Sequence, residues 1–139
     1  EMYEYGQGVA RNLNEAFQWF KRASEGGSVE GRHNLARAHN FGSGTPQNFT
    51  TAEKLYLMGA NEGYVDSMFF LGTLYATGNG SDASINPDIT AYAWLSAAAQ
   101  GGSLIAQTIE ARLLMKLDES EQREAKALAE QLTLRYVGQ

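Results

Sequence analysis

A glycine motif recurs in this sequence at a fixed interval, and that interval constrains the fold more than any other feature. Gly6, Gly42 and Gly78 are 36 residues apart in both steps, and each is followed two positions later by a second glycine. Leu35 and Leu71 keep the same spacing. Self-similarity at a period of this length is typical of a repeat array, in which each unit packs on its neighbours.

Each repeat is predicted to contain two helices. The second helix carries the pattern Ala-x-x-[Trp/Leu]-[Phe/Tyr/Leu]-x-x-[Ala/Gly], which begins at Ala16, Ala52 and Ala91. Apolar residues at i, i+3, i+4 and i+7 form one stripe along a helix. The step from Ala52 to Ala91 exceeds the step from Ala16 to Ala52 by three, so we expect an insertion of that length within 81–86.

Capping residues and glycines mark the expected helix ends. Side-chain caps should start the second helices at Asn12, Thr50 and Asn86. Left-handed glycines should end them at Gly27, Gly63 and Gly102. The first helices are expected over about residues 29–40, 65–77 and 104–115.

The sequence changes character after the third repeat. Glu110 stands where Leu35 and Leu71 stand in earlier repeats, and no Gly-x-Gly follows it. A capping box at Asp118–Glu121 instead starts a helix with a polar outer side, as the exposed end of an array requires. The expected boundaries are 1–27 for a partial first repeat, 28–63 and 64–102 for two full repeats, and 103–139 for a capping repeat. Because only the end of its first helix is present, the natural array is expected to extend upstream.

The repeat motif resembles the Sel-one-like repeat (SLR) family, a glycine-rich relative of the tetratricopeptide repeat. Residues 67–80 fit the first half of the family motif closely, with the Leu71-Gly72 pair, Tyr75 and Gly-x-Gly in place. Tyr3 onward fits the second half, whereas His39 replaces the usual tyrosine. The resemblance implies an all-α fold, a right-handed α/α superhelical solenoid of tetratricopeptide-like helix–turn–helix repeats.

The stripe residues and the repeat leucines should form the core of such a solenoid. The predicted core residues are Tyr5, Ala16, Trp19, Phe20, Ala23, Leu35, Ala52, Leu55, Tyr56, Leu71, Leu74, Tyr75, Ala91, Trp94, Ala98, Leu113 and Leu128.

Composition narrows the function. The net charge of −5 argues against a nucleic-acid binder, which needs a basic face. No apolar run is long enough to span a bilayer, so direct membrane insertion is not expected. The absence of cysteine excludes disulfides, thiolate metal sites and a cysteine nucleophile. It also counts against the disulfide-bearing SLR proteins that bind cell-wall fragments.

No group of residues in the sequence supports catalysis, a metal or a cofactor. The Gly-x-Gly copies follow helices rather than strands, so they indicate turns rather than phosphate loops. His33 and His39 are six positions apart and cannot share a metal as an i, i+4 pair would, and His39 is expected to pack or cap. Trp19 and Trp94 fall on the helix stripes and are interpreted as core residues. We therefore predict that the chain is not an enzyme.

The resemblance implies a scaffold or adaptor that binds a protein or peptide along the inner wall of the solenoid. By analogy with tetratricopeptide arrays, the first helices present the candidate partner-binding residues His33, Arg37, Asn40, Phe69, Thr73, Arg112, Met115 and Lys116. This stripe is locally basic with an aromatic residue at its centre, which favours an acidic partner segment. The alternative for this stripe is that Phe69 packs between repeats and the arginines only solvate the wall.

A second function is compatible with the same sequence. The chain could be a structural or regulatory segment of a larger bacterial protein that packs on another domain or forms a homodimer. Because many members of the family are bacterial envelope proteins, the resemblance alone points to an exported or periplasmic location.

Overall fold

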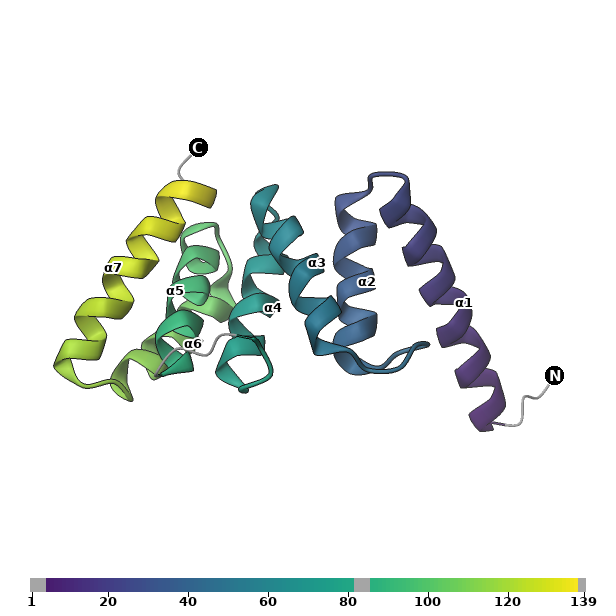
Figure 1. Cartoon of the computed structure of the whole chain (residues 1–139), viewed down its shortest axis with the longest axis horizontal. Coiled ribbons are helices and arrows are strands. Elements are labelled where there is room, and N and C mark those ends of the chain that lie inside the picture. Colours follow the sequence, from purple (N-terminus) through teal and green to yellow (C-terminus); the bar gives the residue numbers. More distant parts are fainter. Residues whose placement is uncertain (1–4, 82–85, 138–139) are drawn as a thin grey trace. The chain divides into compact units, whose positions relative to one another are not determined.

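Helices account for most of the described chain. The computed structural model describes residues 5–81 and 86–137, with side chains described from residue 12 onward. The helices within these ranges are α1 (Tyr5–Glu25), α2 (Val29–Phe41), α3 (Phe49–Asn61), α4 (Val65–Ala76), α5 (Pro87–Gln100), α6 (Leu104–Met115) and α7 (Glu119–Tyr136) (Figure 1). The chain divides into two compact units, Glu1–Leu55 and Tyr56–Gln139, with the division inside α3.

Most helix ends lie where the sequence predicts them. The Asn86 side chain caps α5 by accepting a hydrogen bond of 3.0 Å from the Asp88 amide, with Pro87 as the first helical residue. Asp118 and Glu121 form the expected reciprocal capping box at the start of α7. Glycines with left-handed φ follow α1, α3 and α5: Gly27 (96°), Gly63 (80°) and Gly102 (110°). Only a residue without a β-carbon adopts these angles cheaply, which explains the periodic glycines there.

Two predicted helix starts are wrong, and the first is that of α3. This helix begins at Phe49, and its cap is Asn48, whose side chain accepts a 3.0 Å hydrogen bond from the Thr51 amide. Asn48 precedes Thr50 and offers the better capping side chain, so the cap lies two positions earlier than expected.

The second wrong start concerns the first Gly-x-Gly motif, which is not a turn in this structure. α1 runs without interruption from Tyr5 to Glu25, through Gly6 and Gly8, and Asn12 lies inside it rather than at a cap. Glycine permits a reversal of the chain but does not force one. A helix tolerates each glycine at a cost of about 1 kcal/mol relative to alanine, so the two glycines do not prevent α1 from continuing.

Small residues let α1 and α2 approach closely in the first unit. A β-carbon built on Gly31 of α2 would lie 2.5 Å from the Ala23 β-carbon. In the turn after α2, a β-carbon built on Gly44 would collide with the Leu13 carbonyl of α1. His39 packs edge-on against Phe17 with 5.5 Å between ring centroids, which confirms its predicted packing role. Burial lowers the pKa of His39.

Trp19 is not a core residue, contrary to the prediction. Its side chain is 66% exposed, and the Arg22 guanidinium lies 5.4 Å from the ring centroid. The equivalent Trp94 is 6% exposed because Tyr136 of α7 covers it, with 5.3 Å between ring centroids. No described helix of the first unit covers Trp19 in this way, so burial of this stripe position depends on a neighbouring helix.

α5 is the centre of the second unit. It contacts α4, α6 and α7 (Figure 1). Residues 91–99 are all buried. α4 and α5 meet at Gly72, where a β-carbon would lie 2.7 Å from Leu95 Cγ. Tyr56, at the start of this unit, stacks on Phe70 of α4 with 5.8 Å between centroids.

The remaining core predictions divide into two groups. The buried residues are Leu35, Ala52, Tyr56, Leu71, Leu74, Tyr75, Ala91, Trp94, Ala98 and Leu113. The half-buried residues are Ala16, Phe20, Ala23, Leu55 and Leu128. The side chain of Tyr5, and the expected insertion between 81 and 86, lie outside what the structure describes.

Candidate functional site

The structure buries two of the three candidate binding residues of α2. His33 is 4% exposed and Asn40 is 7% exposed, so their side chains offer almost no surface to a partner. Arg37 lies between them in sequence and is exposed. In the first unit, the predicted binding surface is therefore reduced to Arg37.

Arg37 borders a small hollow on the surface of the first unit. The hollow has a volume of about 190 Å³, and Phe20 of α1 and Phe41 of α2 form part of its apolar lining. Phe41 is 58% exposed. A guanidinium beside exposed aromatic surface is a common combination at protein interfaces.

Phe69 and Thr73 of α4 are half-buried and engaged within the second unit. Phe69 packs edge-on against Phe70, with 5.3 Å between ring centroids. The Thr73 hydroxyl donates a 2.8 Å hydrogen bond to the Phe70 carbonyl. The ring of Phe69 thus packs within the unit and keeps only part of its surface exposed.

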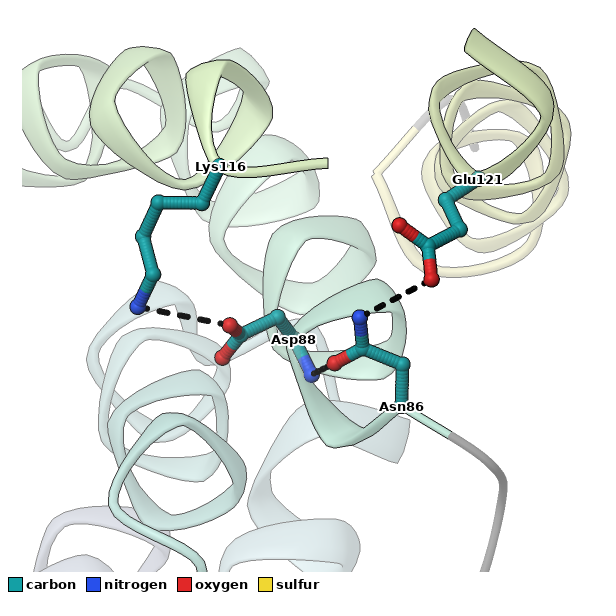
Figure 2. Close-up of polar contacts among 4 residues, drawn as sticks. All are labelled: Asn86, Asp88, Lys116 and Glu121. Carbon is teal, nitrogen blue, oxygen red and sulfur yellow. Dashed lines mark hydrogen bonds and ion pairs between the residues drawn. The ribbon is translucent and has the colours of Figure 1, made fainter. Parts of the chain in front are cut away.

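Lys116 is part of a polar cluster that joins α5, α6 and α7 (Figure 2). Its ammonium lies 3.4 Å from an Asp88 carboxylate oxygen. Asn86 caps α5 through its side-chain oxygen and donates a 3.2 Å hydrogen bond from its amide nitrogen to Glu121 (Figure 2). The charge of Lys116 is therefore matched inside the unit, which leaves the surface less basic than the sequence suggests.

α6 presents an exposed stripe that contains the other two candidates. Leu104 is 75% exposed and Met115 is 83% exposed, and Thr108, Ala111 and Arg112 between them are also exposed. At about 100° per residue these five side chains fall within one face of the helix, here called the α6 face. Ile105, 64% exposed, lies beside it.

The equivalent stripe on α4 is partly covered: Gly72 is buried, whereas Phe69 and Thr73 are half-buried. Gly72 and Val65 occupy the repeat positions of Ala111 and Leu104, and both meet α5. A β-carbon on Gly72 would touch Leu95, and one on Gly101 would lie 2.7 Å from a Val65 methyl carbon. On α4, two residues therefore pack against a helix, whereas the equivalent residues of the α6 face are exposed.

α7 follows α6 but packs on α5 (Figure 1). Residues 116–118 form the whole connection between the two helices, whereas residues 77–86 separate α4 from α5. The Gln122 side chain fixes this short turn by donating 3.0 Å hydrogen bonds to the carbonyls of Leu114 and Leu117. The path of α7 leaves the α6 face exposed.

A second feature, missed by the sequence reasoning, is a polar group beside α5. The Ser96 hydroxyl hydrogen-bonds the side chains of Tyr92 and Glu110. Burial raises the pKa of Glu110 and, helped by the charge of Glu110, also raises the pKa of Tyr92. Tyr92 and Ser96 line an open pocket of about 450 Å³ between α5 and α7. The carboxylate in a leucine position was the signal that could have indicated this group.

The described residues contain no cluster of three or more side chains suited to a metal ion. Within the same residues, no helix combines the length and apolar character needed to cross a membrane.

Comparison with known proteins decides the family. The model of the Sel1 repeat matches residues 1–28, 29–64 and 65–103. The chain belongs to the Sel1 repeat family. The predicted resemblance and the all-α solenoid fold are thereby confirmed, and the Sel1 repeat is associated with protein–protein interaction rather than catalysis.

Relatives that contain Sel1-like sequence are found in bacteria and mammals. The chain is 32% identical over 107 residues to the uncharacterized protein NMB1327 of Neisseria meningitidis, covering 77% of this chain and 22% of that protein. It is 33% identical over 99 residues to protein sel-1 homolog 2 of Rattus norvegicus, covering 71% of this chain and 14% of that protein.

A solved structure shares the fold. The crystal structure of c5321, a protective antigen of uropathogenic Escherichia coli strains with an SLR fold, superposes with a TM-score of 0.80 at 23% identity. The match covers 90% of this chain and 26% of that one. The chain thus spans about a quarter or less of the length of each of these proteins.

Proposed function

We propose that this chain is a non-enzymatic scaffold that binds a segment of a partner protein through the first helices of its Sel1 repeats. The observation that carries the proposal is the α6 face, where exposed apolar side chains lie beside an arginine and no described helix covers them. Exposed apolar patches of this kind mark interaction surfaces.

The charged part of the site supports an acidic partner segment. Arg112 has no ion-pair partner among the described residues, while Arg37 is exposed beside the hollow of the first unit. Each arginine is proposed to pair with a carboxylate of the partner. Phe69, Thr73, Met115 and Lys116 contribute their exposed surface, and His33 and Asn40 support α2 from inside.

The experiment compares two charge-reversed forms of the full-length parent protein, tagged and purified from its own cells. Arg37→Glu with Arg112→Glu removes both proposed contacts. Lys21→Glu with Arg123→Glu makes the same change in net charge at exposed positions on α1 and α7. We expect the wild type and the control to retain the same co-purifying proteins and the first variant to lose them. Equal retention by both variants, or no enrichment over a tag-only sample with the wild type, would refute the proposal.

The second candidate is a structural segment that packs on another domain of its parent or forms a homodimer. The short coverage of the relatives favours it, because most of each relative lies outside the match. Size-exclusion chromatography with light scattering tests the homodimer directly. A monomer mass from micromolar to millimolar concentration would exclude self-association, and a concentration-dependent dimer mass would support it.

A further inference from the structure

We propose that the α6 face binds one antiparallel amphipathic helix of a partner protein, with a stripe like that of α5 and an acidic first turn. This inference rests on the proposed scaffold function and specifies the partner segment. It is carried by the equivalence between α6 and α4: α5 packs on Gly72 and Val65 of α4, whereas the equivalent residues of α6, Ala111 and Leu104, are exposed.

The α6 face has a small residue at its centre. On α4, Gly72 lies beneath Leu95 so closely that even a methyl group would collide. On α6 the corresponding residue is Ala111, which is exposed and small. A small residue at the centre of a helix face leaves a depression for a larger side chain from a facing helix. The occupant should therefore place a leucine or another large apolar residue over Ala111.

The packing of α5 on α4 indicates the direction of the bound helix. On α4, Leu95 lies over Gly72 and Gly101 lies over Val65, so residue numbers rise along α5 as they fall along α4. The same packing on α6 puts the amino-terminal half of the occupant beside the last turn of α6, with its first turn just beyond Met115. Leu104 would meet the other end of the bound helix.

Arg112 gives the carboxyl-terminal end of the α6 face a positive charge. Arg112 lies in the last turn of α6 and makes no ion pair or hydrogen bond with another side chain of the described residues. With a large side chain over Ala111, the first turn of an occupant as long as α5 lies beyond Met115, so an acidic residue there meets Arg112 through a guanidinium extended toward the end of α6. That residue is also favoured by the occupant's own helix dipole. α5 has this feature in Asp88. The stripe of α5 together with its acidic first turn therefore describes the occupant.

Binding of a peptide with the α5 sequence, residues 87–100, tests the inference on the intact chain. The peptide carries a fluorophore and a hydrocarbon staple across the positions of Ala93 and Ala97, on the side opposite Leu95, and fluorescence anisotropy reports binding. Saturable binding is expected, weakened at least tenfold by Ala111→Arg, which blocks the centre of the exposed face. Ala127→Arg, an equal change at an exposed alanine of α7, should leave the affinity unchanged.

A charge exchange tests the direction and the ion pair. Arg112→Glu should weaken binding of the peptide about fivefold or more, and a peptide with Asp88→Lys should restore the affinity for that variant. Arg123→Glu is the matched control on α7 and should respond to neither peptide. Because all four protein positions are exposed, their thermal unfolding should match the wild type.

Three results would overturn the inference: no saturable binding up to millimolar peptide, equal weakening by Ala111→Arg and Ala127→Arg, or no recovery with the Asp88→Lys peptide. A fourth is self-association of the chain that Ala111→Arg abolishes, since a second copy would then fill the face. Failure here leaves the scaffold proposal standing if partner retention in cells still depends on Arg37 and Arg112.

Discussion

α3 and α4 pack closely at a pair of small residues, Gly59 and Ser67. A β-carbon on Gly59 would lie 2.3 Å from the Ser67 hydroxyl oxygen and 2.9 Å from its β-carbon. Rotating the hydroxyl relieves the first contact but not the second, because the backbone fixes the β-carbon. One repeat earlier the same positions are Ala23 and Gly31, so the glycine has moved to the other helix while the pair still carries a single β-carbon.

This exchange predicts a compensating double substitution. Gly59→Ala alone gains about 1 kcal/mol in helix propensity but incurs overpacking of about 1–3 kcal/mol, so it should be neutral to destabilising. Ser67→Gly alone should cost about 1 kcal/mol through lost propensity and packing. The double variant recreates the arrangement of the first unit and should recover about 1–2 kcal/mol relative to the sum of the two single changes.

Equilibrium urea unfolding followed by circular dichroism measures the four corners of this cycle. As a control for additivity, Gly59→Ala is combined with Ser120→Gly, an exposed serine near the start of α7. That pair should show no coupling beyond about 0.5 kcal/mol. If the effects of Gly59→Ala and Ser67→Gly on the free energy of unfolding were as additive as those of the control pair, the reasoning would be refuted. α3 and α4 could then move apart to accept the added methyl group. Ala98 and Ala106, the third pair, are both fully buried with two methyl groups, so such separation is sterically possible elsewhere.

Three further predictions concern packing and protonation. Gly72→Leu should lower the melting temperature strongly, because its side chain would enter Leu95 and no local movement of one side chain can accommodate it; an unchanged melting temperature would contradict the contact. The raised pKa of Glu110 means that the folded chain holds this proton more tightly than the unfolded chain, so its contribution to stability falls as pH rises above 4.5. Glu110→Gln should therefore be more stable than the wild type at about pH 7 but not at about pH 4 in urea titrations. The lowered pKa of His39 has the opposite consequence: the free energy of unfolding falls as pH drops below 6.5, because the unfolded chain binds this proton more tightly. His39→Tyr should remove this loss of stability at low pH. A variant with the same pH profile as the wild type would contradict the prediction.

The fold was predictable because its signals are local and repeated. Glycines at helix ends and apolar stripes at helical spacing are visible in one sequence, and the structure places α2, α4 and α6 within one residue of expectation. Trp19 was not predictable in the same way. Its stripe position is identical to that of Trp94, and only the covering helix differs.

The candidate site was less predictable for a related reason. Analogy between repeats identifies which face of α2 a residue occupies but not how closely neighbouring helices enclose it, so His33 and Asn40 were expected to be more accessible than they are. The pairing of Lys116 with Asp88 joins two segments that are distant in the sequence and leaves no periodic trace. The exposure of the α6 face follows from the route of α7, which the short connection after α6 determines.

The central position of α5 has a consequence for synthesis of the chain. Its buried residues 91–99 are made before α6 and α7, and Tyr136, which covers Trp94, is made only with the last turn of α7. At roughly 5–20 residues per second, a tryptophan-bearing and alanine-rich helix stays partly uncovered for several seconds. α4 is available as a partner throughout that interval, and α6 only during its later part. The nascent chain is therefore expected to be most vulnerable to aggregation and chaperone capture between the completion of α5 and the docking of α7.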